Sequence, residues 1–126
     1  VQPIEQQSEE ERVKQAIIAM FEKTYKDSDK PIFGEKCQWR AIYHVLKEKE
    51  LTDKTLCEFA EWVNSLVDEN RVPCTEHSLR KKKGICYNKE KSRWESEDSG
   101  KSGNHMCQLL NRIDTVFRKE LEILGL

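Results

Sequence analysis

The chain has 126 residues, of which 36% are charged and 37% hydrophobic, and its formal net charge at pH 7 is −1. This length fits one domain, residues 1–126, which can bury roughly two-thirds of its unfolded surface without a disulfide or a metal. The near-neutral charge excludes a protein that coats nucleic acid with its whole surface. The longest apolar run, Ala16–Phe21, is far shorter than the ~20 residues of a membrane span, so we expect no membrane partner.

The first helix is expected over residues 9–25, after a frayed segment at residues 1–7. Ser8 is a good N-cap residue, and Glu11 three positions later completes the capping-box pattern. The acidic first turn also favours the positive end of the helix dipole. The apolar residues that follow share one helical face: Val13, Ile17, Met20, Phe21 and Tyr25. Pro31 and its polar neighbours then predict a loop.

Two further helices are expected over residues 35–49 and 53–68. Apolar residues at helical spacing mark their buried faces: Trp39, Ile42, Tyr43 and Leu46 in one, and Leu56, Phe59, Ala60, Val63, Leu66 and Val67 in the other. Thr52 is the expected N-cap of the later helix, with Leu51 and Leu56 as a hydrophobic staple. His44 lies one position off the apolar stripe, which indicates a surface or boundary histidine.

The segment after Pro73 is expected to form a short fourth helix over residues 76–83, with Thr75 as its N-cap. Gly84 is well placed to end this helix, because glycine readily adopts the left-handed conformation. Two short runs with aromatic and aliphatic residues then flank a polar turn, which predicts either a small β-hairpin or an irregular loop within residues 85–94. Residues 95–103 contain no apolar side chain and predict a mobile loop.

The last helix is expected to begin after Asn104 and to continue almost to the end of the chain. Its apolar stripe comprises Met106, Leu109, Leu110, Ile113, Val116, Phe117, Leu121 and Leu124. Gly125 is expected to close it. The pattern as a whole predicts an all-α fold, an irregular bundle of about five helices, with room for the small hairpin near residues 85–94.

Positive charge is concentrated in one stretch, Leu79–Trp94, which contains seven basic residues and one acidic residue. Residues 71–94 carry a net charge of +6, whereas the segments on both sides are acidic. An anionic partner would therefore meet one basic helix-plus-loop patch rather than a uniformly basic surface.

The helix after Thr75 combines small polar residues at its start with bases after them. In this feature the middle third of the chain resembles helix-turn-helix proteins, whose recognition helix enters the major groove. The resemblance implies contact with duplex DNA through phosphate-binding and base-reading side chains, with Tyr87 and Trp94 offering flat faces. The candidate nucleic-acid-binding residues are Thr75, Ser78, Arg80, Lys81, Lys82, Lys83, Lys89, Lys91 and Arg93.

The leading functional hypothesis is therefore a small cytoplasmic DNA-binding or regulatory protein that uses this patch. The alternative is a non-catalytic protein–protein interaction module, in which the basic stretch binds an acidic protein partner or an exposed apolar helix face forms an oligomer. We expect no enzyme, because no spacing groups a nucleophile, a base and an orienting acid.

The five cysteines are expected to be reduced thiols of a cytoplasmic protein, because their number is odd and no C-x-x-C pair occurs. Five residues are the candidate zinc ligands: Cys74, His77, Cys86, His105 and Cys107. Their spacings match no zinc motif, so neither a metal nor another cofactor is expected.

Overall fold

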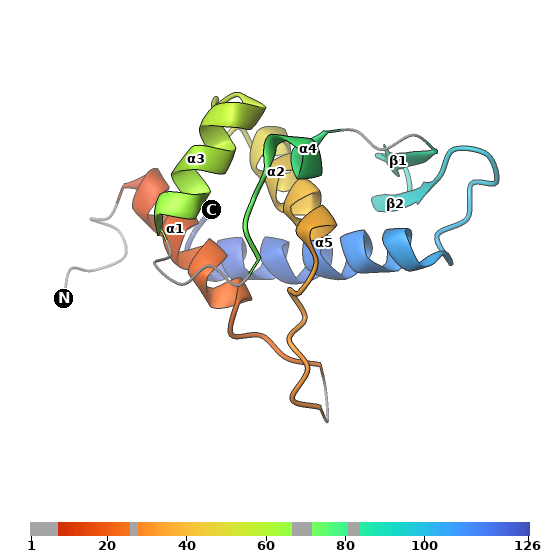
Figure 1. Ribbon diagram of the computed structural model, residues 1–126, viewed down its shortest axis with the longest axis horizontal. Helices are drawn as coiled ribbons and strands as arrows, with labels where there is room; N and C mark the ends of the chain where they lie inside the picture. The colour runs from red at the N-terminus through yellow and green to blue at the C-terminus, as the bar shows by residue number, and fades with distance from the viewer. Residues whose placement is uncertain (1–7, 26–27, 67–71, 81–83) are drawn as a thin grey trace.

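The computed structural model describes residues 8–25, 28–66, 72–80 and 84–126. Within these residues the fold is mainly helical with one two-stranded hairpin (Figure 1). The elements are α1 (Glu9–Met20), the 3-10 turn η2 (Lys36–Gln38), α2 (Trp39–Glu48), α3 (Leu56–Leu66), α4 (Glu76–Leu79), β1 (Ile85–Asn88), β2 (Arg93–Ser96) and α5 (His105–Ile123). No helix in the described ranges has both the length and the apolar character needed to cross a membrane.

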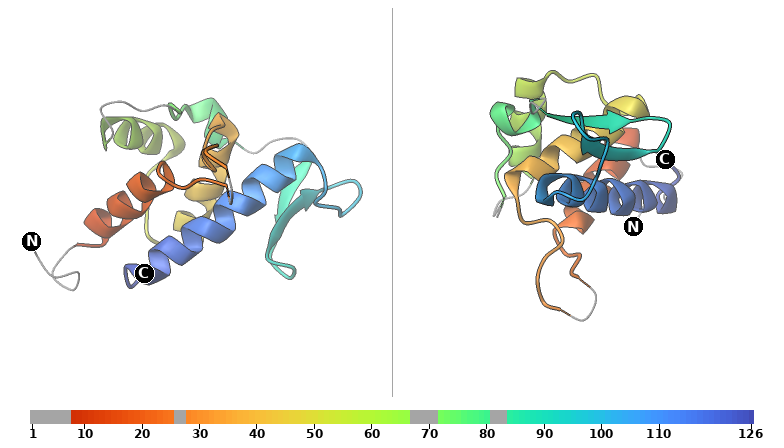
Figure 2. Two further views of the ribbon diagram at one scale, coloured as in Figure 1. Left: turned by 90° about the horizontal axis from the view of Figure 1, so that it is seen from below. Right: turned by 90° about the vertical axis from the view of Figure 1, so that its right-hand side faces the viewer.

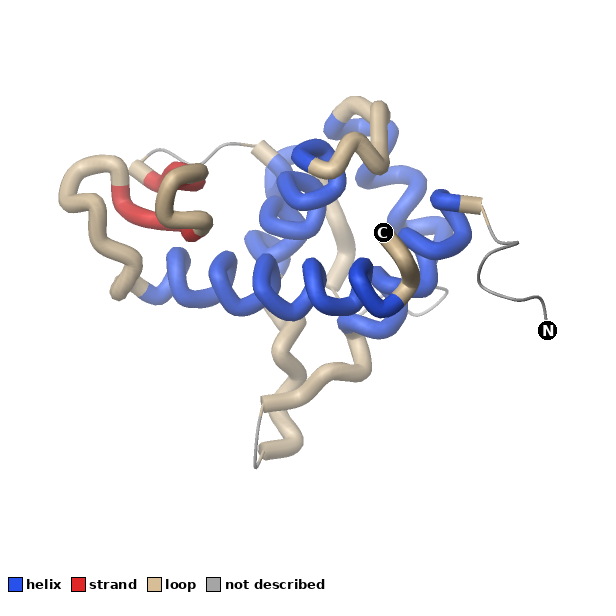
Figure 3. Tube along the Cα trace, turned by 180° about the vertical axis from the view of Figure 1, so that it is seen from behind, coloured by secondary structure: helices blue, strands red, loops and turns tan. Residues whose placement is uncertain are grey.

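Helix α5 is the longest element and organises the others around it (Figures 1 and 3). Its first half packs against the hairpin, and its second half packs against α1, while α2 crosses between these two contacts. Seen from the hairpin side, β1 and β2 lie over the beginning of α5 (Figure 2). The hairpin and α2 therefore lie side by side, because both pack against α5.

The hydrophobic core lies where α1, α2, α3 and α5 meet. Its fully buried large side chains include Ile17, Met20, Trp39, Ile42, Leu46, Phe59, Leu110, Ile113, Phe117 and Leu121. Burying one such side chain stabilises the folded state by about 1.5–3 kcal/mol. Phe59 and Val63 both point into this core, which confirms the predicted face of α3.

Helix α1 begins as predicted but is shorter than predicted. The Ser8 hydroxyl accepts a hydrogen bond from the Glu11 N–H at 3.2 Å. The helix ends at Met20 rather than near residue 25, because the chain beyond it folds back on the following loop. There the Ile32 N–H donates to the Lys23 carbonyl at 2.9 Å, so this pairing replaces further helical turns.

The ends of the two middle helices differ in detail from the predictions. Helix α2 is preceded by a single 3-10 turn within the predicted range. The N-terminus of α3 is capped by Thr55, not Thr52, because the Thr55 hydroxyl accepts from the Glu58 N–H at 3.2 Å and the Glu58 carboxylate accepts from the Thr55 N–H at 3.1 Å. The predicted end of this helix, residues 67–68, lies outside the described residues.

Helix α4 is a single turn, in contrast to the predicted range of residues 76–83. Thr75 caps it as predicted, but Arg80 is already extended, with φ −69° and ψ 150°. Gly84 therefore does not end the helix; its φ of +85° belongs to the entry into the hairpin. Residues 81–83 lie outside the described part of the chain.

Of the two alternatives expected for residues 85–94, the hairpin is the one that forms, and it extends two residues further. Its strands are antiparallel, with Tyr87 opposite Trp94 and Ile85 opposite Ser96. Glu95 and Ser96 thus belong to β2, whereas they were expected in the loop over residues 95–103. Asn104 caps α5 as predicted, its side chain accepting from the Cys107 N–H at 2.7 Å.

Candidate binding groove between α2 and the hairpin

The two hydroxyl residues of the predicted DNA-binding set cap α4. The Thr75 hydroxyl accepts from the Ser78 N–H, and the Ser78 hydroxyl accepts from the Thr75 N–H, both at 3.1 Å. Ser78 is also buried and donates to the Thr75 carbonyl at 2.7 Å. Both side chains are therefore engaged in holding the helix start.

Two of the predicted basic residues are paired with carboxylates. Arg80 is exposed and lies 2.9 Å from a carboxylate oxygen of Glu76. Arg93 lies 3.3 Å from a carboxylate oxygen of Glu95 and also donates to the Gly100 carbonyl at 3.1 Å. These pairs reduce the positive charge that the two arginines present to a partner.

The remaining predicted residues are lysines. Lys89 and Lys91 are exposed at the hairpin turn. Lys81, Lys82 and Lys83 lie outside the described residues. Of the basic patch expected from the sequence, the described part thus consists of two turn lysines and two paired arginines.

The predicted zinc candidates are not brought together. Across the described ranges, no group of three or more His, Cys, Asp or Glu side chains has an arrangement that could hold a metal ion. The five cysteines are free thiols, of which Cys74 and Cys107 are buried. Burial raises the pKa of the Cys74 thiol to about 12, which keeps it protonated and unreactive.

A groove of about 350 Å³ lies between α2 and the hairpin. Its lining residues are Arg40, Tyr43, His44, Lys47, Leu79, Cys86, Tyr87 and Trp94. Four of them come from α2 at spacings of three, one and three, which places them on one face of that helix. The hairpin supplies the opposite wall, and α4 contributes a single residue.

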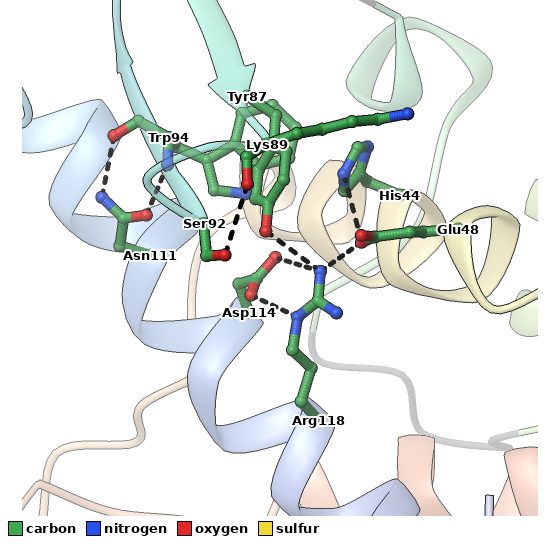
Figure 4. Close-up of polar contacts among 9 residues, drawn as sticks. All are labelled: His44, Glu48, Tyr87, Lys89, Ser92, Trp94, Asn111, Asp114 and Arg118. Atoms are coloured by element: carbon green, nitrogen blue, oxygen red, sulfur yellow. Dashed lines mark hydrogen bonds and ion pairs between the residues drawn. The ribbon is translucent and has the colours of Figure 1, made fainter.

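The hairpin wall is fixed to α5 by a pair of hydrogen bonds (Figure 4). The Asn111 side chain accepts from the Trp94 N–H at 2.6 Å and donates to the Trp94 carbonyl at 2.9 Å. The Trp94 ring then meets α2, with the His44 ring centroid 5.0 Å away and the Arg40 guanidinium 4.8 Å from the ring centroid. The tryptophan therefore joins the hairpin to the basic face of α2.

Within the described residues, three buried side-chain nitrogens of this groove have no hydrogen-bond partner: Nη1 of Arg40, Nε1 of Trp94 and Nε2 of His44. One other buried side-chain nitrogen within the described ranges shares this property, Nε of Arg12. His44 Nε2 still lies 3.7 Å from a carboxylate oxygen of Glu48. The exposed fractions of Arg40 and Trp94 are only 7% and 2%. Burying an unpaired polar group costs about 1–3 kcal/mol of stability. Several such groups in one groove therefore need an explanation, and a bound ligand that supplies hydrogen-bond acceptors is one.

Arg40 is the most costly of the three, because it is a buried cation. Its Nη2 donates to the Ile85 carbonyl at 3.4 Å, a long hydrogen bond. Burial lowers the pKa of the guanidinium, and the nearby side chains of Cys86 and Glu97 oppose that shift. The arginine remains charged at neutral pH, because its ordinary pKa is far above 7.

A second polar cluster supports the groove from beneath (Figure 4). Arg118 of α5 donates to Asp114 at 2.7 Å, to the Tyr87 hydroxyl at 3.3 Å, and to Glu48. The hydrogen bond from Arg118 lowers the pKa of Glu48. For His44, burial lowers the pKa, and the nearby Glu48 carboxylate opposes that shift.

Comparison with known proteins adds no relative to this picture: the chain matches no family model, no curated protein and no solved structure. The site is therefore interpreted from its own geometry. That geometry presents nitrogen donors and cationic groups between aromatic walls, an arrangement that suits a ligand bearing hydrogen-bond acceptors and negative charge.

Sequence reasoning missed Arg40 and Lys47 and treated Tyr87 and Trp94 only as flat faces of a basic patch. One signal was present in the sequence: Arg40, His44 and Lys47 recur at helical spacing beside the apolar stripe of α2. The hairpin wall had no such signal, because its contact with α2 depends on the tertiary fold.

Proposed function

We propose that this protein is a non-catalytic interaction domain that binds an acidic segment of a partner protein in the groove between α2 and the hairpin. The observation that carries this proposal is the buried Arg40, whose guanidinium has a long hydrogen bond to one carbonyl and an unpartnered Nη1. A carboxylate is the ligand that best matches a buried guanidinium in charge and geometry.

The surroundings of Arg40 support a protein partner. Lys47 is exposed at the groove and adds a second cation, and Lys89 extends above Tyr87 toward His44 (Figure 4). Half-buried Tyr43 and Tyr87 form walls of the kind that bind apolar side chains at protein interfaces. A segment with alternating acidic and apolar residues complements both features.

The test is selection from a library of random short peptides displayed on phage, using the full chain as bait. We expect enrichment of peptides with acidic residues next to apolar ones, and their affinity should fall at least tenfold for Arg40→Gln. Arg80→Gln is the matched control, because it removes the same charge from an exposed site outside the groove. Failure to enrich acidic peptides, or equal losses in both variants, would contradict the proposal.

Duplex DNA is the second candidate partner, favoured by the exposed Lys89 and Lys91 at the hairpin turn. Two observations weaken this candidate, one for base contacts and one for phosphate contacts. Helix α4 is one turn long, which is too short to lie in a major groove as a recognition helix. Residues 84–101 also balance four basic against four acidic residues.

Fluorescence anisotropy with a labelled duplex at low salt tests this candidate. If four phosphates are contacted, the slope of the logarithm of the affinity against the logarithm of the salt concentration should be about −3.6. Replacing Lys89 and Lys91 together by glutamine should flatten this slope, whereas Arg40→Gln should leave it unchanged. Absence of binding at low salt would exclude duplex DNA as a partner.

A further inference from the structure

We infer that the groove holds the side-chain carboxylate of a Glu or Asp between the Arg40 guanidinium and the Trp94 indole N–H, with a neighbouring aromatic side chain of the partner against Tyr43 and Tyr87. This inference rests on the proposed function and specifies its ligand chemistry. It identifies Trp94 as a recognition residue, not only as a core residue.

The two donors are positioned together by the fold. The guanidinium lies over the Trp94 ring, 4.8 Å from its centroid, and the ring is fixed by the two hydrogen bonds between the Trp94 backbone and Asn111. Each donor residue is more than nine-tenths buried, and each retains one nitrogen without an acceptor in the part of the chain that the structure describes. A single carboxylate has two oxygens and can satisfy both.

The charge balance favours a carboxylate over a phosphate. Burial lowers the pKa of His44, so this ring is neutral near neutral pH and leaves Arg40 as the buried cation of the groove. Glu48 lies 3.7 Å from His44 Nε2, and Asp114 shares the Arg118 cluster with Glu48 (Figure 4). Arg118 balances one of these two negative charges, and the carboxylate of Glu97 also acts on Arg40. The remaining negative charge opposes a dianion more strongly than a monoanion, so one negative charge is the better match.

The aromatic walls of the groove, Tyr43 and Tyr87, determine which partner side chain fits beside the carboxylate. Tyr43 is held by its hydroxyl, which donates to the Lys54 carbonyl at 2.6 Å, and Tyr87 is held through the Arg118 cluster. Both rings therefore keep their positions while a flat side chain packs against them. Because the Trp94 indole nitrogen is buried and has no acceptor among the described residues, a carboxylate that accepts from it must change the environment of the indole.

The test uses the full chain labelled with ¹⁵N and follows the indole N–H signals of its tryptophans by NMR. The probe is acetyl-Phe-Glu-amide, whose only carboxylate belongs to the side chain. Its neutral match is acetyl-Phe-Gln-amide. A third peptide, acetyl-Phe-Ala with a free C-terminal carboxylate, tests whether the groove binds a terminal carboxylate in place of a side-chain carboxylate. Trp39 is an internal control, because its indole already donates to the Val72 carbonyl at 2.7 Å.

We expect the Trp94 signal to move downfield in a saturable manner with the Glu probe, and the Trp39 signal to stay in place. The Gln probe and the free terminal carboxylate should bind at least tenfold more weakly. Arg40→Gln should abolish the Trp94 response, and Arg80→Gln should retain it. Lys47→Gln, at an exposed position, should weaken binding without removing the Trp94 response, and it serves as a second variant if Arg40→Gln does not fold.

Different experimental outcomes would contradict this inference and the proposed function. If acidic peptides bind the groove while the Trp94 signal is unchanged, or responds equally to the Glu and Gln probes, this inference is wrong and the proposed function stands. If peptide selection yields no Arg40-dependent acidic ligand, the proposed function is wrong as well.

Discussion

Trp39 and Trp94 are both buried, yet they occupy two different kinds of environment. Trp39 packs edge-to-face against Phe21 and Phe33, and its indole N–H donates to the Val72 carbonyl at 2.7 Å. Trp94 lies against the charged and polar side chains of the groove, and its indole N–H has no acceptor. Trp39 thus has its donor satisfied within the core, whereas the groove holds buried donors that have no acceptor among the described residues, which is the feature on which the proposed binding rests.

The largest effect is expected on the core side of this comparison. Phe59 is fully buried in α3, so Phe59→Ala should lower the free energy of unfolding by about 3–5 kcal/mol through lost burial and a residual cavity. Urea denaturation followed by circular dichroism measures the change. Ile123→Ala is the control, because Ile123 is 70% exposed and should change stability by less than about 0.5 kcal/mol. A cost near zero for Phe59→Ala would contradict the assigned core.

A smaller effect is expected in the cluster that supports the groove. Arg118→Met should lower the free energy of unfolding by about 1–3 kcal/mol, because it leaves the buried carboxylate of Asp114 without its main donor. Adding Asp114→Asn should recover part of that loss, since an amide is less costly to bury than a charge. Additive losses in the urea denaturation of the double variant would show that the two side chains do not act as a pair.

The two tryptophans themselves allow a more direct comparison. Trp39→Phe removes the donor to the Val72 carbonyl, whereas Trp94→Phe removes an indole N–H that has no partner. Both changes lose similar apolar volume, so Trp39→Phe should cost about 1–2 kcal/mol more, as expected for one buried hydrogen bond. Equal losses in urea denaturation would mean that the Trp94 N–H also has an acceptor in solution.

Much of the helical core could be predicted from the sequence, because helix faces are encoded locally. The apolar periodicity predicted the buried sides of α1, α2, α3 and α5, and the caps at Ser8, Thr75 and Asn104 are confirmed. The wrong boundaries have tertiary causes. Helix α1 stops early where the chain pairs with its own loop, and α3 starts late at the capping box between Thr55 and Glu58.

The groove could not be predicted in the same way, because it forms between segments that are distant in sequence. Arg40 shares a helical face with His44 and Lys47, but its contact with Trp94, more than fifty positions later, is what shows that this face borders the hairpin. Unpartnered nitrogens are a property of three-dimensional packing and have no pattern along the chain. The basic stretch, by contrast, was conspicuous in the sequence, but two of its arginines are paired with neighbouring carboxylates.

The smallest expected effect concerns His44, which lies in the groove and contacts Trp94 and Tyr87. Burial lowers its pKa, and the positive charges of Arg118 and Arg40 add to that shift, while Glu48 and Asp114 oppose it. A base with a lowered pKa in the folded state binds its proton more readily when unfolded, so stability should fall as the pH drops below about 6.5, the ordinary pKa of histidine. The Glu48 carboxylate contributes only at lower pH, because Arg118 lowers its pKa.

Thermal unfolding between about pH 5 and about pH 8 measures this contribution. The wild-type melting temperature should decline on the acidic side of about pH 6.5, and His44→Gln should reduce that decline because glutamine does not titrate. His105→Gln is the matched control, since His105 is an exposed residue at the start of α5, and its removal should leave the decline intact. If His44→Gln retained the full decline, other groups would be responsible, and the assignment of a neutral His44 in the groove would be wrong. A reduced decline would support a groove in which Arg40 is the buried cation, as binding of one carboxylate requires.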